Sequence, residues 1–106
     1  MPPIDVFEAI AHKTRRRLLR LLADGDRPAG ELASYFDESR PAVSRHLRVL
    51  REAELVRARE EGREWHYTLD MEPLLETYQR WIAPFVPGWE AGLQELKRRV
   101  EEAEGL

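Results

Sequence analysis

The spacing of the apolar residues changes at Leu55, and this change limits the folds that the chain can adopt. Before Leu55, apolar residues recur every three or four positions, which is typical of amphipathic helices. After it, "LVRAREEGREWHYTL" alternates apolar and polar residues, and it predicts two strands joined by a tight turn at Glu61 and Gly62. The pattern therefore predicts a mainly α fold with a small β-hairpin.

Four helices are expected before the hairpin. The first three are predicted over residues 3 to 11, from about residue 13 to residue 24, and from Ala29 to Phe36. The fourth follows Ser39, which is a good N-cap, and Pro41 suits its first turn because the missing N–H is not needed there. On this helix Val43, Leu47 and Leu50 recur at i, i+4 and i+7 and mark the buried side.

The rest of the chain is expected to be helical but interrupted. Pro84, Pro87 and Gly88 predict a helix to about residue 83, a kink, and a second helix from about 88 to 103. Apolar residues follow a heptad-like seam here, with several aromatics among them. A dimer interface is the first interpretation of this seam, and a pocket for a small apolar effector at the kink is the alternative.

Composition restricts the class of protein. With 106 residues, one domain is expected, and 42% hydrophobic and 35% charged residues are typical of a soluble globular chain. No apolar run approaches the roughly 18 residues of a membrane span, no secretory signal is visible and cysteine is absent, so a cytoplasmic location without disulfides is expected. The enzyme motifs sought are absent, so neither an enzyme nor a cofactor is predicted.

Positive charge is concentrated in the middle of an acidic chain. The net charge is −3 overall, but it is −2 over residues 1 to 12, +3 over residues 13 to 68 and −4 over residues 69 to 106. Residues 39 to 51 contain four arginines and no acid. This distribution suggests that the middle of the chain meets a polyanion, with pairwise neutralisation on a solvated surface as the alternative.

The fourth helix has the pattern of a DNA-reading helix. Arg45 and Arg48 project opposite its apolar side, and a guanidinium can bridge guanine O6 and N7 or bind phosphate. In the hairpin, Arg57, Arg59 and Arg63 could reach the phosphate backbone beside the groove. An ordinary solvated arginine face is the alternative for the helix.

The segment "AHKTRRRLLRLLADGDRPAGELASYFDESRPAVSRHLRVLREAELVRAREEGREWHYTL" resembles the winged helix-turn-helix core of ArsR-type bacterial transcriptional repressors, and the resemblance covers about residues 4 to 70. It implies that the fourth helix is the recognition helix, that the hairpin is the wing, and that the first and last helices pair two subunits. The DNA contacts it implies are Ser39, Arg40, Pro41, Ala42, Ser44, Arg45, His46 and Arg48 on the helix, with Arg59 and Arg63 on the wing.

The expected architecture is one winged helix-turn-helix domain over residues 1 to 106, with dimerisation helices over about 71 to 104. The predicted interface residues are Ile4, Phe7, Tyr78, Trp81, Phe85, Trp89 and Leu93. The predicted partners are double-stranded DNA and a second copy, with a small apolar effector or a protein partner as open variants. The predicted function is a homodimeric repressor on a pseudo-palindromic operator, and the alternative is an interaction module that binds an acidic protein.

The best-known members of the resembled family bind metals through cysteines of the third helix or through Asp, His and Glu of the last one, and both sites are missing from this sequence. The segment "ELASYFDES" has no cysteine, and no histidine follows His66. The three histidines, His12, His46 and His66, lie on three different predicted elements, whereas zinc usually takes three or four convergent ligands. We therefore predict a member of the family that does not sense metals, with His46 near DNA.

Overall fold

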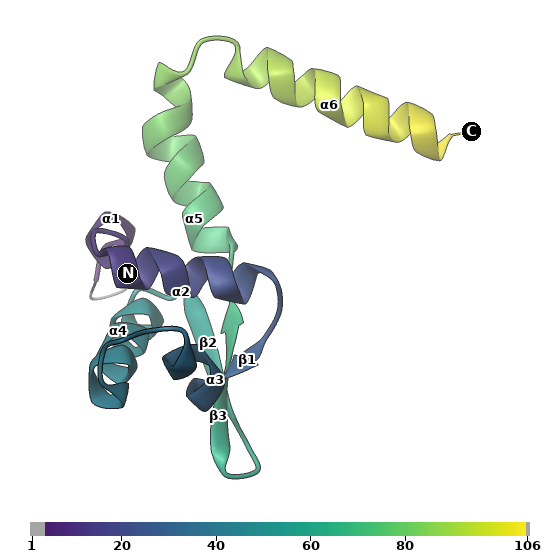
Figure 1. The fold of residues 1–106 in the computed structure, drawn as a ribbon. Helices are drawn as coiled ribbons and strands as arrows, with labels where there is room; N and C mark the ends of the chain where they lie inside the picture. Colours follow the sequence, from purple (N-terminus) through teal and green to yellow (C-terminus); the bar gives the residue numbers. More distant parts are fainter. Residues whose placement is uncertain (1–3, 106) are drawn as a thin grey trace. The chain divides into compact units, whose positions relative to one another are not determined.

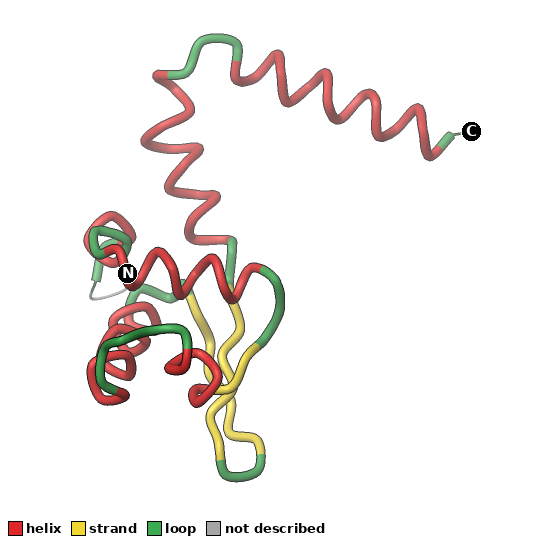
Figure 2. Tube along the Cα trace, in the orientation of Figure 1, coloured by secondary structure: helices red, strands yellow, loops and turns green. Residues whose placement is uncertain are grey.

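The computed structural model describes residues 4–105, apart from the side chain of Trp89. Figure 1 shows the order of the elements, and Figure 2 separates the helices from the three strands. The elements are α1 (Val6–Ala9), α2 (Lys13–Ala23), β1 (Arg27–Pro28), α3 (Ala29–Ser34), α4 (Arg40–Glu52), β2 (Val56–Glu61), β3 (Glu64–Leu69), α5 (Glu72–Thr77), the π-helix η1 (Tyr78–Ile82), the 3₁₀ helix η2 (Ala83–Phe85) and α6 (Trp89–Glu104).

Side-chain caps set the starts of the first helices. The carboxylate of Asp5 accepts the N–H of Phe7 at 2.7 Å, and Nδ1 of His12 accepts the N–H of Thr14 at 3.0 Å. These bonds satisfy amide groups that have no partner within the helix. Helix α1 spans Val6–Ala9 and is shorter than the predicted helix over residues 3 to 11, of which residue 3 lies outside the described residues, whereas α2 agrees with its prediction.

A hydrophobic core joins α2, α3, α4 and the hairpin. Its largest fully buried side chains are Leu18, Leu32, Val43, Leu47, Leu50 and Leu55. Three of these come from α4, as its apolar spacing predicts, and they fix which side of α4 faces the protein. The packing leaves the opposite side of α4 exposed to solvent.

The hairpin is confirmed, and it belongs to a three-stranded antiparallel sheet with the order β1-β3-β2. Glu61 pairs with Glu64, so the turn is at Gly62 and Arg63, one residue later than predicted. Gly62 has φ of +65°, which glycine adopts at little cost. The two-residue strand β1 was not predicted, because "RP" is too short to show an alternating pattern. It forms through the pairing of Arg27 with Tyr67 of β3.

The chain divides into two compact units, Met1–Leu74 and Leu75–Leu106. The division lies close to the predicted end of the winged-helix core at about residue 70, while the prediction of a single domain remains a prediction. The predicted interruption of the C-terminal helix is present in the second unit. Pro84 offers no N–H to the carbonyl of Arg80, and the helix widens into η1 and tightens into η2 around it.

Candidate nucleic-acid interface

Helix α4 begins at a well-formed cap and has two distinct sides. The hydroxyl oxygen of Ser39 accepts the N–H of Ala42 at 3.2 Å, with Pro41 in the first turn, as predicted. The buried side carries three apolar residues of the core. Ser44, Arg45 and Arg48 are exposed on the other side, which makes α4 a rigid support for guanidinium groups facing solvent.

The structure brings most of the predicted DNA-contacting residues onto one surface of α4. The exposed ones are Ser39, Arg40, Pro41, Ser44, Arg45 and Arg48. Ala42 is half-buried. This exposed set, together with Arg63 at the turn of the hairpin, is called the arginine face below.

The arginines of this region differ in how they are neutralised. Among the described residues, Arg45 and Arg63 make no hydrogen bond or ion pair. A guanidinium of Arg40 lies 3.5 Å from Glu64, and that of Arg48 lies 3.8 Å from Glu52. Exposed ion pairs of this kind are weak, so a DNA phosphate can replace the carboxylate as the partner of Arg40 or Arg48. Arg45 and Arg63 can bind DNA without first giving up a carboxylate.

Arg59 on the wing is engaged within the protein. Its guanidinium donates to Asp26 at 3.1 Å, to Glu61 at 3.2 Å and to the hydroxyl of Thr68 at 3.2 Å. The bond to Asp26, with further contributions from Glu61, raises the pKa of Arg59 above its ordinary value. A phosphate contact by Arg59 would have to compete with two carboxylates, so Arg63 is the better placed wing cation.

His46 is on α4 but does not belong to the arginine face. Its side chain is only 15% exposed and lies against α2. Nε2 is 3.2 Å from Oε2 of Glu38, and Nδ1 is 3.2 Å from Nη1 of Arg15. Both ring nitrogens are therefore occupied within the protein, which counts against the predicted contact of His46 with DNA.

Glu64 is a residue of the interface that the sequence did not single out. Its Oε1 accepts the N–H of Gly30 at 3.1 Å in the first turn of α3, and the same oxygen pairs with Arg40. A carboxylate is favourable at this helix end because amide N–H groups are unpaired there. The pairing of β1 with β3 brings Glu64 to α3, so the missed strand also concealed this contact.

The wing is attached to α4 through an aromatic contact. The guanidinium of Arg51 lies over the ring of Trp65, 5.7 Å from its centroid. Such a cation–π contact holds the indole against the end of α4. Figure 1 shows the tip of the β2 and β3 hairpin projecting beyond α3 and α4.

The predicted interface residues fall into different environments. Ile4 is half-buried and packs against the core, while Phe7 is 45% exposed. In the second unit Trp81, Phe85 and Leu93 are exposed, Phe85 at 82%. Tyr78 is half-buried, and the side chain of Trp89 lies outside the described part of the structure.

A cleft of about 530 Å³ lies at the proline kink, where an effector pocket was the alternative prediction. Its lining includes Gln79 and Glu90 as well as Val86 and the two prolines. A mixed lining of this kind does not favour an apolar ligand, and the effector remains a prediction.

The described residues were also considered for membrane-spanning helices and for metal-binding clusters. Within residues 4–105, no helix is long and apolar enough to cross a membrane. In the same range, no three His, Cys, Asp or Glu side chains converge in a way that could hold a metal ion. The predicted lack of metal sensing stays a prediction.

Comparison with known proteins places the chain among bacterial regulators. A sequence model described as "Bacterial regulatory protein, arsR family" matches residues 12–58. The chain is 37% identical over 82 residues to the transcriptional repressor SdpR of Bacillus subtilis (strain 168), covering 77% of this chain and 90% of that protein. It is 32% identical over 101 residues to the arsenical resistance operon repressor of Escherichia coli (strain K12), covering 94% and 75% respectively. A crystal structure of a possible transcriptional regulator for arsenical resistance aligns with a TM-score of 0.72 at 37% identity, over 87% of this chain and 96% of that chain.

Proposed function

Since this chain belongs to the ArsR family of bacterial regulatory proteins and is a DNA-binding transcriptional regulator, we propose that it is a homodimeric repressor that occupies a pseudo-palindromic operator. The observation that carries the proposal is the exposed Arg45 on the outward side of the capped helix α4, which has no ion-pair partner within residues 4–105. The relatives are regulators and not enzymes, which confirms that prediction, and they do not favour the alternative of a protein-interaction module.

In this proposal α4 enters the major groove and the wing follows the backbone. Arg45 bridges the O6 and N7 acceptors of a guanine, which is the commonest specific contact of an arginine. Arg40 and Arg48 exchange their carboxylate partners for phosphates, and Arg63 at the hairpin turn binds phosphate beside the groove. The exposed position of each of these four side chains supports the assignment.

The apolar surface of the second unit supports a dimer. Its exposed large apolar residues are Leu75, Trp81, Ile82, Phe85, Val86, Leu93, Leu96 and Val100. So much exposed apolar surface in a small unit is typical of a protein interface, and a second copy is the occupant we propose. Leu93, Leu96 and Val100 follow the three- and four-residue spacing of a coiled-coil seam on α6.

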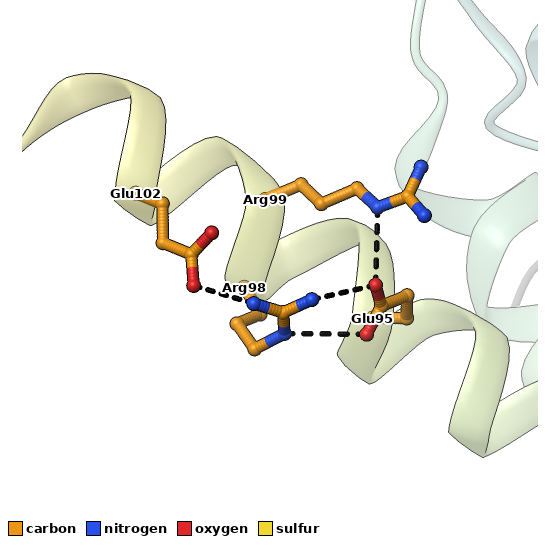
Figure 3. A network of polar contacts seen from close by, with 4 residues as sticks. All are labelled: Glu95, Arg98, Arg99 and Glu102. Carbon is orange, nitrogen blue, oxygen red and sulfur yellow. Dashed lines mark hydrogen bonds and ion pairs between the residues drawn. The ribbon is translucent and has the colours of Figure 1, made fainter.

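On the polar side of α6, arginines are paired with glutamates of the same helix. This pairing supports the apolar side of α6 as the contact surface. Arg98 donates to both oxygens of Glu95, at 2.7 and 3.2 Å, and also to Glu102, while Arg99 donates to Glu95 at 3.0 Å (Figure 3). These arginines have carboxylate partners on the same helix, whereas Arg45 on α4 has none in the part of the chain that the structure describes. We therefore propose that α6 pairs subunits, while α4 reads DNA in the cytoplasm.

Binding to the DNA upstream of the protein's own gene tests the proposal. Two recognition helices of a dimer would enter successive major grooves about 34 Å apart, so two chains should bind each operator. The affinity should fall steeply as the salt concentration rises, because arginine–phosphate contacts release counterions. Fluorescence anisotropy with labelled duplexes measures both the affinity and the stoichiometry.

Arg45→Ala is the decisive variant, and Arg98→Ala on α6 is its matched control. Arg45→Ala should lose about 1 to 3 kcal/mol of discrimination between operator and random DNA, as expected for a bidentate guanine contact. Arg98→Ala removes the same charge from a helix that we place away from DNA and should leave this discrimination unchanged. Equal discrimination by Arg45→Ala and the unchanged protein would refute the assignment of Arg45.

A further inference from the structure

A cluster of polar side chains lies behind α4, where α4 packs against α2. The hydroxyl of Thr14 donates to Oε1 of Glu38, and Oε2 of Glu38 lies 3.2 Å from Nε2 of His46. On the other edge of the same imidazole, Nδ1 lies 3.2 Å from Nη1 of Arg15. The ring of His12 is 4.3 Å from that of His46, measured between centroids.

The chemistry of these groups determines which form of His46 fits. A guanidinium only donates hydrogen bonds, so Nδ1 of His46 must accept from Arg15. Nε2 then carries the hydrogen and donates it to the carboxylate of Glu38. The neutral imidazole satisfies both neighbours at once, whereas a protonated imidazole has no acceptor for Arg15 and places a second positive charge against it.

Arg15 extends the same set of bonds to α1. Its Nε donates to the carbonyl of Ala9 at 2.6 Å, and its Nη2 donates to the carbonyl of Glu8 at 3.2 Å. A continuous series of hydrogen bonds therefore runs from the end of α1 through Arg15 to His46, and on to Glu38. Glu38 directly precedes Ser39, the residue that caps α4.

We propose that His46 is a positioning residue that, as a neutral imidazole, holds α4 against α1 and α2, so that protonation of His46 loosens α4 and weakens DNA binding. The part of this inference that concerns DNA rests on the proposed function. The part that concerns the placement of α4 stands on the contacts within the first unit.

Burial and neighbouring charge act in the direction that the proposal needs. Burial lowers the pKa of His46 from its ordinary value of 6.5, electrostatic interaction with His12 and with the guanidinium of Arg15 lowers it further, and Glu38 opposes them. Among the described residues, the titratable groups that act on His46 are His12 at the cap of α2, Arg15 on α2 and Glu38 in the turn before α4. Since the unfolded chain binds the proton more readily, the free energy of unfolding should decrease as the pH falls below about 6.5.

Glu38 titrates in a different range, which keeps the two effects apart. The hydrogen bond from the hydroxyl of Thr14, helped by the interaction with His46, lowers the pKa of Glu38 from 4.5, while burial acts in the opposite direction. The contribution of the charged carboxylate to stability is therefore present above pH 4.5 and is lost as the pH falls through the lowered value. Between about pH 5.5 and 7.5, Glu38 stays charged and His46 is the group of this pair that changes.

The first experiment needs no DNA. Urea unfolding from about pH 7.5 to 5.5 should show a loss of stability in the unchanged protein. His46→Gln should remove most of this loss, and His66→Gln, which removes an imidazole outside the cluster, should keep it. An NMR titration of the His46 ring in the unchanged protein should give a pKa below 6.5. A value at or above 6.5 would overturn the proposal even where His46→Gln does not fold.

The second experiment repeats the pH series with an operator duplex at constant ionic strength. The affinity of the unchanged protein and of His66→Gln should fall about fivefold or more between about pH 7.5 and 5.5. His46→Gln should bind more weakly than the unchanged protein at the higher pH and lose little further affinity at the lower one. An undiminished pH dependence in His46→Gln would overturn the positioning role. Failure of the unchanged protein to prefer any operator would refute the proposed function instead, and the unfolding and NMR results would still decide the role of His46.

Discussion

Helices α4 and α6 both carry arginines, but they divide charge and apolar surface in opposite ways. On α4 the apolar side is buried in the core, and Arg45 faces solvent without a carboxylate partner among the described residues. On α6 the arginines are paired with Glu95 and Glu102, and the apolar side is exposed. The role of a helix is therefore indicated less by its number of arginines than by two other properties. These are whether its apolar side is buried and whether its arginines are paired with carboxylates.

The largest expected effect concerns the buried side of α4. Leu47→Ala should lower the free energy of unfolding by about 2 to 5 kcal/mol, because it removes a fully buried side chain and leaves a cavity. Urea unfolding measures the change. Ser44→Ala, on the exposed side of the same helix, should stay within about 0.5 kcal/mol of the unchanged protein. Similar losses in the two variants would mean that α4 is oriented differently.

Substitutions on the exposed apolar side of α6 should weaken the self-association of the protein. Leu96→Asp should weaken self-association at least about tenfold, because it places a charge in the proposed apolar seam. Gln94→Asp introduces the same charge two residues away, outside the seam, and should associate almost normally. Sedimentation equilibrium over a concentration series compares the two variants, and equal association constants would remove α6 from the interface.

The caps of the two helices offer a smaller test. Ser39→Ala should cost about 1 kcal/mol, because the N–H of Ala42 then has no side-chain acceptor. The N-cap residue of α6 is Gly88, which has a φ of +75° and provides no side-chain cap. Thermal unfolding of Ser39→Ala against Ser44→Ala isolates the cap. Alanine has a higher helix propensity than serine, so a loss common to both serine variants would mean that the cap is not its cause.

The smallest effect is expected on the polar side of α6. Glu95→Gln should lower the helical content only slightly, because exposed pairs three and four residues apart stabilise a helix weakly. The bonds from Arg98 and Arg99 lower the pKa of Glu95 from 4.5, so the difference should vanish as the pH falls through that lowered value. Circular dichroism at low and high salt measures it, with Glu101→Gln, a glutamate outside these pairs, as the control that should leave the content unchanged.

Much of the first unit could be predicted because its signals are local. The spacing of Val43, Leu47 and Leu50, the cap at Ser39 and the alternation after Leu55 all act within one element and appear directly in the sequence. The exposed position of Arg45 follows from the same spacing. The end of α2 just before Gly25 could also be predicted, because glycine commonly follows the last residue of a helix.

What could not be predicted depends on contacts between distant elements. The strand at Arg27 forms only because β3 offers it a partner, and Glu64 reaches Gly30 only through that pairing. His46 was predicted to lie near DNA because helical spacing does not decide whether a residue between the buried and the exposed side of α4 faces the protein or the solvent. Its placement inside follows from Arg15 and Glu38, which lie far from it along the chain or beyond the cap.

The sequence by itself determined the helices, the hairpin and the side of α4 that carries free charge, because hydrophobic period, caps and turn residues act over a few positions. Only the tertiary structure decided which arginines are neutralised, that a third strand forms, and that two histidines from different elements meet. Those outcomes depend on how side chains converge in space, and the energy of a charged or titratable group is set by that environment more than by its neighbours along the chain.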